Sequence, residues 1–175
     1  MSRVLIVYST TDGHTLRICD RLRDVLEALA HQVTLVPVTE ARDAELEKYD
    51  TIVVGASIRY GRHRPEVVEF IERNAQALNR KASAFFSVNV VARKPEKNQL
   101  QSNPYVRKLL RKIAWHPREV GVFAGKIDYP RYGPVDRMVI RFIMWLTGGP
   151  TDPKAVVEFT DWRQVEAFGG LIARM

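Results

Sequence analysis

The chain opens with VLIVYSTTDGHT, residues 4–15, in which an apolar run is followed by a loop rich in hydroxyl groups. No polar residue alternates with the apolar ones in residues 4–8, and this pattern predicts a strand buried on both faces. Apolar residues at helical spacing follow the loop, so a helix is expected from about Gly13 to Ala30. A buried strand joined to a helix by a short loop is typical of the start of a parallel α/β sheet.

The same alternation of strands and helices continues along the chain. Further strands are expected at residues 33–36, 51–55, 84–88 and 120–123, the last breaking off and resuming at 156–159. Helices are expected at 65–78, 102–113 and 162–172, with Thr160-Asp161 capping the last. We therefore predict an α/β fold, a flavodoxin-like doubly wound sheet of five parallel strands in the order 2-1-3-4-5, with a long insertion in the fifth strand.

Length and composition favour one globular domain, residues 1–175, with an insertion at 127–153. The chain has 175 residues, close to the usual size of roughly 150 residues per domain. Apolar residues make up 46% of the chain, which argues against disorder, and a single cysteine excludes an internal disulfide framework. The formal net charge of +7 indicates an anionic partner, such as a nucleic acid, a membrane surface or an acidic small molecule.

Ligands of such sheets bind at the carboxyl ends of strands, where the strand order reverses. The loops to inspect are therefore those after Tyr8, Gly55 and Val88. Hydroxyl groups and free backbone N–H groups at a helix start make the first loop a cradle for a phosphate monoester. It lacks the lysine of nucleoside-triphosphate loops and the GxGxxG of dinucleotide folds. The alternative is that these residues only cap the helix.

Residues 8–15 resemble the phosphate loop of flavodoxins, (S/T)-x-x-G-x-T after the first strand, with Asp12 as a departure that leaves this residue a backbone role. The rest of the chain is more similar to the bacterial protoporphyrinogen oxidases of the flavodoxin superfamily, quinone-dependent enzymes of haem biosynthesis. GASIRYG at 55–61, FSVNVVARKPEK at 86–97, YPRY at 129–132 and TDW at 160–162 carry this resemblance. It covers nearly the whole chain.

The resemblance implies FMN as the cofactor, held by the phosphate loop and by two loops around the isoalloxazine ring. The implied cofactor-binding residues are Ser9, Thr10, Thr11, Asp12, Gly13, His14, Thr15, Ser57, Ile58, Arg59, Tyr60, Gly61, Ser87, Val88, Asn89, Val90 and Val91. Tyr60 is a candidate for stacking on the ring. The second ring loop has no aromatic residue, so either one flavin face is open to a substrate or Val90 packs there.

The implied activity is oxidation of protoporphyrinogen IX to protoporphyrin IX, with menaquinone or ubiquinone as electron acceptor. Arg59, Arg93, Lys94 and Lys97 are the candidates for holding the substrate's propionates or stabilising a reduced, anionic flavin. No catalytic acid or base is assigned. Two alternatives stay open: a quinone reductase fed by NAD(P)H, and an electron-transfer flavodoxin that docks on a protein partner. No recognition motif supports nucleic-acid binding.

Two predicted helices are candidates for contact with a membrane. Arg107, Lys108, Arg111 and Lys112 form the polar face of the helix at 102–113, which suits either anionic lipid or solvent. The insertion predicts an apolar helix at 134–146, about 20 Å long and too short to cross a bilayer. Lipid, quinone, porphyrin or a second copy of the chain can cover this helix, or it can fold onto its own domain. We favour a membrane-facing lid over the flavin edge.

The cysteine and the histidines are assigned no catalytic or metal-binding role. Cys19 is expected to be a small buried residue of the first helix, and the histidines lack the spacing of metal ligands. The chain shows no signal peptide and no apolar stretch of the roughly 18 residues that span a bilayer. The expected location is therefore peripheral, on the cytoplasmic face of the inner membrane, without a transmembrane span.

Overall fold

A parallel sheet of five strands forms the centre of the molecule. The computed structural model describes residues 1–41 and 44–175, and the strands pair in the order β2-β1-β3-β5-β6. Their bounds are β1 (Arg3–Ser9), β2 (Gln32–Pro37), β3 (Thr51–Arg59), β5 (Ala82–Asn89) and β6 (Glu119–Ala124). All four pairings are parallel, so the predicted doubly wound sheet and its strand order are confirmed. A short strand that was not predicted, β4 (Arg62–His63), pairs antiparallel with the end of β3.

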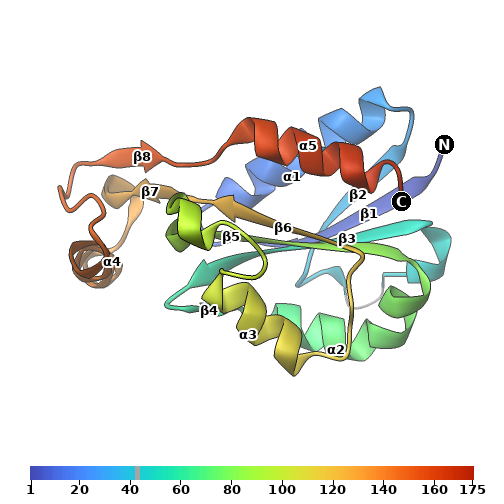
Figure 1. Cartoon of the computed structure of the whole chain (residues 1–175), viewed down its shortest axis with the longest axis horizontal. Helices are drawn as coiled ribbons and strands as arrows, with labels where there is room; N and C mark the ends of the chain where they lie inside the picture. Colours follow the sequence, from blue (N-terminus) through green and yellow to red (C-terminus); the bar gives the residue numbers. More distant parts are fainter. Residues whose placement is uncertain (42–43) are drawn as a thin grey trace.

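Helices cover both faces of this sheet (Figure 1). α1 (His14–Ala28) and α5 (Trp162–Ile172) pack side by side on one face, and α2 (Pro65–Arg80) and α3 (Pro104–Lys112) cover the other. Both α2 and α3 begin with a proline, whose missing N–H costs nothing at a helix start. Asn103 caps α3 and Asp161 caps α5, each by accepting backbone N–H bonds. The short 3-10 helices are η2 (Leu46–Lys48), η3 (Val90–Arg93), η4 (Pro95–Lys97) and η5 (Tyr129–Arg131).

The opening strand shows why the sheet is buried on both sides. Leu5 and Val7 lie in the core cluster beneath α2 and α3, while Val4 and Ile6 lie in the cluster beneath α1 and α5. Successive side chains of a strand point to opposite faces, so an unbroken apolar run supplies both clusters at once. Cys19 is fully buried in the second cluster, as expected, and burial raises the pKa of its thiol.

The predicted continuation of the fifth strand is wrong. β6 ends at Ala124, and the next strands, β7 (Lys126–Asp128) and β8 (Val156–Glu158), pair antiparallel with each other as a separate ribbon. The reason lies in the neighbouring strand: β5 ends at Asn89, which is the partner of Ala124, and the chain then turns into η3. Beyond Ala124 the sheet therefore offers no strand with which residues 156–159 can pair.

The ribbon carries a helix that stands away from both helical layers. α4 (Pro134–Thr147) begins with a proline and ends at Gly148, which adopts the left-handed conformation with φ 69°. It lies at the end of the molecule opposite the chain termini (Figure 1). A small apolar cluster of Ile127, Tyr129, Tyr132 and Met144 joins α4 to the ribbon. The helix expected at 134–146 is thus present, and it is not part of the main core.

Candidate functional site

The loop between β1 and α1 leaves its polar groups free for a ligand. Gly13 adopts φ 82° just before α1, and its N–H donates to Thr10 Oγ1 at 3.0 Å. No side chain caps the start of α1, so apart from the Thr10 bond to Gly13 the hydroxyls of this loop do not serve as helix caps. The first turn of α1 therefore presents free N–H groups and its positive dipole end to this loop, an arrangement that binds anions.

Four buried polar atoms around this loop have no hydrogen-bond partner within the described residues. They are Ser9 Oγ, His14 Nδ1, Thr15 Oγ1 and Ser57 Oγ. Leaving such an atom unpaired in the interior costs about 1–3 kcal/mol, and natural proteins retain few of them. Their gathering at the ends of β1 and β3 fits a ligand that supplies the missing partners, and hydroxyl donors suit the oxygens of a phosphate monoester.

His14 is fixed by the segment that leads into α5. Its Nε2 lies 2.6 Å from Thr160 Oγ1, and that hydroxyl donates to the Ala124 carbonyl at 2.7 Å. Because the single hydroxyl hydrogen of Thr160 is used there, His14 Nε2 is the donor of their bond. Burial lowers the pKa of His14; Glu158 opposes this, and Arg17 adds to it. The ring therefore ties the start of α1 to the segment that leads into α5.

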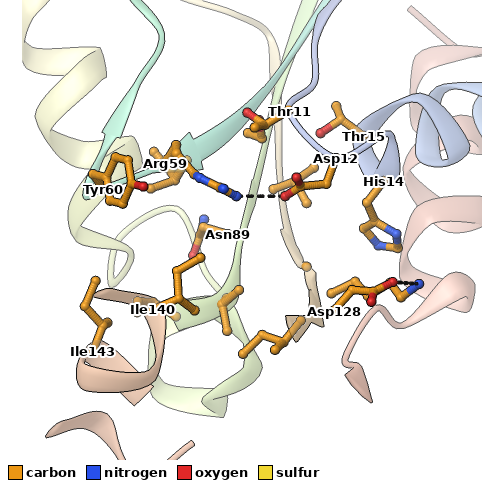
Figure 2. Close-up of a pocket in the computed structure, with 18 of the residues that line it drawn as sticks. Thr11, Asp12, His14, Thr15, Arg59, Tyr60, Asn89, Asp128, Ile140 and Ile143 are labelled. Atoms are coloured by element: carbon orange, nitrogen blue, oxygen red, sulfur yellow. Dashed lines mark hydrogen bonds and ion pairs between the residues drawn. The ribbon is translucent and has the colours of Figure 1, made fainter. Parts of the chain in front are cut away.

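A pocket extends from this loop to α4 (Figure 2). Its empty space, counted together with the open mouth, is about 1030 Å³. Figure 2 shows Thr11, Asp12 and Thr15 on one side of the pocket and Ile140 and Ile143 of α4 on the other. The predicted cofactor residues that line it are Thr10, Thr11, Asp12, His14, Thr15, Ser57, Ile58, Arg59, Tyr60, Gly61, Val88, Asn89, Val90 and Val91.

The other predicted residues lie outside this lining. Ser9 and Ser87 are buried, and Gly13 sets the turn of the loop. Of the four candidate substrate cations, only Arg59 lines the pocket. Arg93 donates instead to the carbonyls of Val90 and Thr147, and so holds the end of α4.

A chain of buried polar groups supports the end of β5 and the turn that follows it. His63 Nε2 lies 3.0 Å from Ser87 Oγ, which also accepts a bond from Asn89 Nδ2 at 3.3 Å. Asn89 Oδ1 in turn accepts from Ala92 N and from Asn103 Nδ2. These bonds link β4, β5, η3 and the start of α3, so Asn89 presents a fixed side chain to the pocket.

Acidification should weaken the fold through His63. Burial lowers the pKa of His63 to about 4, whereas an unfolded chain has a histidine pKa of about 6.5. Between these values the unfolded state binds more protons than the folded state, so stability falls as the pH drops from 6.5 to 4, by roughly 3 kcal/mol in all. Urea unfolding at several pH values measures this effect. We expect the unfolding free energy of the His63→Asn variant to depend less on pH than that of the parent protein.

The exposed His116 provides the control for this measurement. His116→Asn makes the same substitution at an exposed residue outside this buried network, so a difference between the two variants is due to the buried site. An unchanged slope in His63→Asn would show that His63 is not the group responsible.

Arg59 joins the loop between β1 and α1 to α4. Its guanidinium donates to Asp12 Oδ2 at 2.8 Å and to Asp136 Oδ2 at 2.6 Å, and Tyr60 donates its hydroxyl to the same Asp136. It also lies 5.2 Å from the centre of the Tyr132 ring. Burial alone would lower the pKa of Arg59, but the bond to Asp136 and the two carboxylate charges outweigh it and raise the pKa. The Asp12 side chain therefore forms an ion pair, whereas the sequence led us to expect only a backbone role for this residue.

The sequence predicts the helix at 134–146 as a lid, but it does not identify the individual residues that roof the pocket. Tyr105 and the residues Gly125, Lys126, Ile127, Asp128, Arg131, Tyr132, Ile140, Ile143 and Met144 also line it. The spacing of the three α4 residues, at positions i, i+3 and i+4, is the signal that marks one face of that helix as inward. Val90 packs against the same apolar cluster as Met144, whereas Tyr60 is half exposed.

α4 is apolar on its opposite side as well. Val135, Met138, Phe142, Trp145 and Leu146 are each more than half exposed, and we call them the outward face of α4. Such a contiguous exposed apolar surface marks an interaction site in a folded protein. No helix in the described part of the chain is long and apolar enough to cross a membrane. Within residues 1–41 and 44–175 no cluster of three or more potential metal ligands is found.

Comparison with known proteins gives consistent matches. The flavodoxin domain family model matches residues 5–154. Protoporphyrinogen IX dehydrogenase [quinone] of Escherichia coli (strain K12) is 43% identical over 99% of this chain and 96% of its own length. The protein of that name from Leishmania major is 40% identical over 99% of this chain and 75% of its own length. Among solved structures, oxidised flavodoxin 1 of Bacillus cereus superposes with a TM-score of 0.57 at 15% identity, covering 99% of this chain and 98% of that one.

Proposed function

The chain belongs to the flavodoxin domain family, and from this premise we propose that it oxidises protoporphyrinogen IX to protoporphyrin IX, with FMN as cofactor and a membrane quinone as electron acceptor. The observation that carries the proposal is a single pocket that is polar on one side and apolar on the other. Unpartnered buried polar atoms gather at its base, and an apolar helix absent from the main core roofs it. The full-length similarity to two quinone-dependent dehydrogenases of protoporphyrinogen supports the substrate and the acceptor.

The residues at the base of the pocket suit the phosphate monoester of FMN. The hydroxyls of Thr15 and Ser57 line the pocket and lack partners, and the start of α1 offers backbone N–H groups. Each group would give the phosphate or the adjoining ribityl chain a hydrogen bond that this part of the protein does not itself satisfy. When bound, the flavin supplies the electron-transfer chemistry, and the protein binds it, orients it and tunes its surroundings.

Other residues of the pocket position the reactants and limit water. Asn89, fixed by Ser87, Ala92 and Asn103, offers a rigid amide at the second ring loop. Tyr132, Ile140, Ile143 and Met144 form an apolar roof that suits the macrocycle and a quinone ring, both of which are largely apolar. The Arg59 bonds to Asp12 and Asp136 hold this roof over the phosphate loop.

We further propose a peripheral position on the cytoplasmic face of the inner membrane, and the surface supports the peripheral attachment. The outward face of α4 suits the boundary of a lipid bilayer, where Trp145 can serve as an anchor. α3 adds four exposed cations, Arg107, Lys108, Arg111 and Lys112, none of which forms an ion pair with a described residue. Near anionic lipid each such cation contributes about 1 kcal/mol. A protein docked in this way receives quinone directly from the bilayer.

An anaerobic assay with the purified flavin-loaded protein tests this function. With protoporphyrinogen IX and a soluble menaquinone analogue, porphyrin fluorescence should rise at a rate proportional to protein concentration, and omission of the quinone should halt it once the bound flavin is reduced. Absence of porphyrin formation above the protein-free rate would remove the proposed activity. Rapid bleaching of the flavin by NADH would instead favour a quinone reductase fed by a nicotinamide.

A further inference from the structure

We propose that Arg131 forms a carboxylate-binding subsite at the mouth of the pocket and holds a propionate side chain of the tetrapyrrole substrate. This assignment rests on the proposed function and adds a residue that determines which substrates the pocket accepts. Arg131 lines the pocket, and its side chain is exposed. A guanidinium is suited to the role because its planar fork of N–H donors matches both oxygens of a carboxylate.

The other cations that line the pocket are already paired. Arg59 binds Asp12 and Asp136, and Lys126 Nζ lies 3.1 Å from Asp128 Oδ2. Arg131 lines the pocket with them but forms no ion pair with any residue in the described ranges 1–41 and 44–175. An incoming carboxylate therefore meets one guanidinium whose charge is not yet neutralised by the protein.

Recruiting Arg59 instead would be costly. Its side chain is only 19% exposed, and both ends of its guanidinium are bonded to carboxylates. A substrate carboxylate that displaced Asp136 would gain one charged bond while leaving Asp136 without its partner, and removing one member of a partly buried pair destabilises the other. The exchange offers no net gain in binding, whereas a bond to Arg131 breaks no ion pair.

Neighbouring arginines serve the structure rather than a ligand. Arg137 donates to the carbonyls of Tyr129 and Tyr132, and Arg93 donates to the carbonyls of Val90 and Thr147. These bonds hold carbonyl groups of η3, of η5 and the residue that follows it, and of the last residue of α4. They also explain why Arg93, expected from the sequence to hold substrate, is not available for that role.

The backbone on both sides of Arg131 is held in place by two tyrosines. Tyr129 is fully buried and donates its hydroxyl to the Pro150 carbonyl at 2.6 Å. Tyr132 is 7% exposed, and its hydroxyl oxygen accepts a bond from Asp128 N at 3.2 Å. Between these anchors Arg131 turns toward solvent at the end of η5, so its Cα is fixed while the charged group remains free to meet a ligand.

Kinetics with a substrate and its ester test the subsite. The flavin-loaded parent protein, Arg131→Gln and Arg131→Lys are each assayed with protoporphyrinogen IX and with its dimethyl ester, in which the carboxylates carry no charge. For Arg131→Gln we expect the KM for the diacid to rise about two- to fivefold, as the loss of an exposed charged pair gives. The KM for the ester, kcat and flavin content should remain unchanged, and Arg131→Lys should recover part of the loss because it restores charge without the fork.

Arg163→Gln is the matched control. Arg163 is also an exposed arginine that forms no ion pair with a described residue, but it lies on α5 and does not line the pocket. Its variant should retain the parent preference for the diacid over the ester. An Arg131→Gln protein that keeps the parent KM for the diacid, or that loses affinity for diacid and ester equally, would overturn the subsite alone. A parent protein that oxidises neither compound would overturn the proposed function and the subsite with it.

Discussion

Replacing the outward face of α4 by polar residues is expected to lower binding to anionic lipid vesicles by at least a hundredfold. The variant carries Val135→Ser, Met138→Gln, Phe142→Gln, Trp145→Gln and Leu146→Gln. At about 1 kcal/mol for each partly buried apolar side chain, the five changes remove roughly 5 kcal/mol of binding free energy, more than a hundredfold requires. Co-sedimentation with vesicles of mixed neutral and anionic lipid measures the partition coefficient.

The same variant should keep its cofactor site and its activity with a soluble quinone. Ile140, Ile143 and Met144, which face the pocket, are unchanged, and so are the Arg59 bonds that hold α4 in place. Activity with a long-chain quinone embedded in vesicles should fall together with binding. Leu29→Gln is the control, since Leu29 is 54% exposed at the end of α1 and distant from α4 in sequence. Unaltered partitioning of the five-residue variant would remove the membrane role of α4.

The central fold could be predicted because its signals are local. The unbroken apolar run at residues 4–8 indicates a strand buried on both faces, and Leu5 and Ile6 indeed enter opposite core clusters. Apolar runs of this kind alternate along the chain with segments of helical spacing. Because the crossover connections between parallel strands are right-handed and short, few strand orders are possible. The first loop could be recognised for the same reason, because all its hydroxyls lie within residues 9–15.

The contacts of the insertion could not be predicted from local patterns. Arg59 and Asp136 are 77 residues apart, and nothing in either segment indicates the other. Position next to the fourth predicted strand favours Arg93 as a ligand for substrate, but its donors are used by carbonyl groups at the end of α4. The prediction that the fifth strand resumes at 156–159 failed for a similar reason. Residues 156–158 have the composition of a strand, but composition does not indicate the pairing partner. They pair with β7 because β5 ends at Asn89 and leaves no strand of the main sheet beside them.

A sequence pattern can identify the type of a residue without identifying its function. YPRY at 129–132 contributes to the family resemblance but has no chemical meaning until the structure separates its members. The two tyrosines are buried and bonded, whereas the arginine between them is exposed at the pocket. Burial and bonding thus distinguish groups that shape a site from groups that are free to bind in it.

Replacing the Thr15 hydroxyl by a methyl group, in Thr15→Val, is expected to weaken FMN binding by roughly ten- to a hundredfold, the range of a hydrogen bond to a charged group. The same change should stabilise the cofactor-free protein by about 1 kcal/mol, because Thr15 is 1% exposed and its hydroxyl has no partner in the described residues. Fluorescence titration with FMN and urea unfolding of the apoprotein measure the two effects. Their opposite signs separate a ligand-binding hydroxyl from a structural one.

Two comparisons make this separation quantitative. Riboflavin lacks the phosphate, so its affinity should differ less than twofold, or about 0.4 kcal/mol, between the parent and Thr15→Val. Ser83 is equally buried, but its hydroxyl donates to the Leu78 carbonyl and accepts from Trp115 Nε1, so Ser83→Ala should destabilise the apoprotein and leave FMN affinity unchanged. If Thr15→Val instead destabilises the apoprotein and leaves FMN affinity unchanged, as expected for Ser83→Ala, the Thr15 hydroxyl has a structural role and does not bind the ligand. Because an unpaired buried hydroxyl lowers the stability of the protein that carries it, its retention beside three other unpaired polar atoms is accounted for by a ligand that pairs with them.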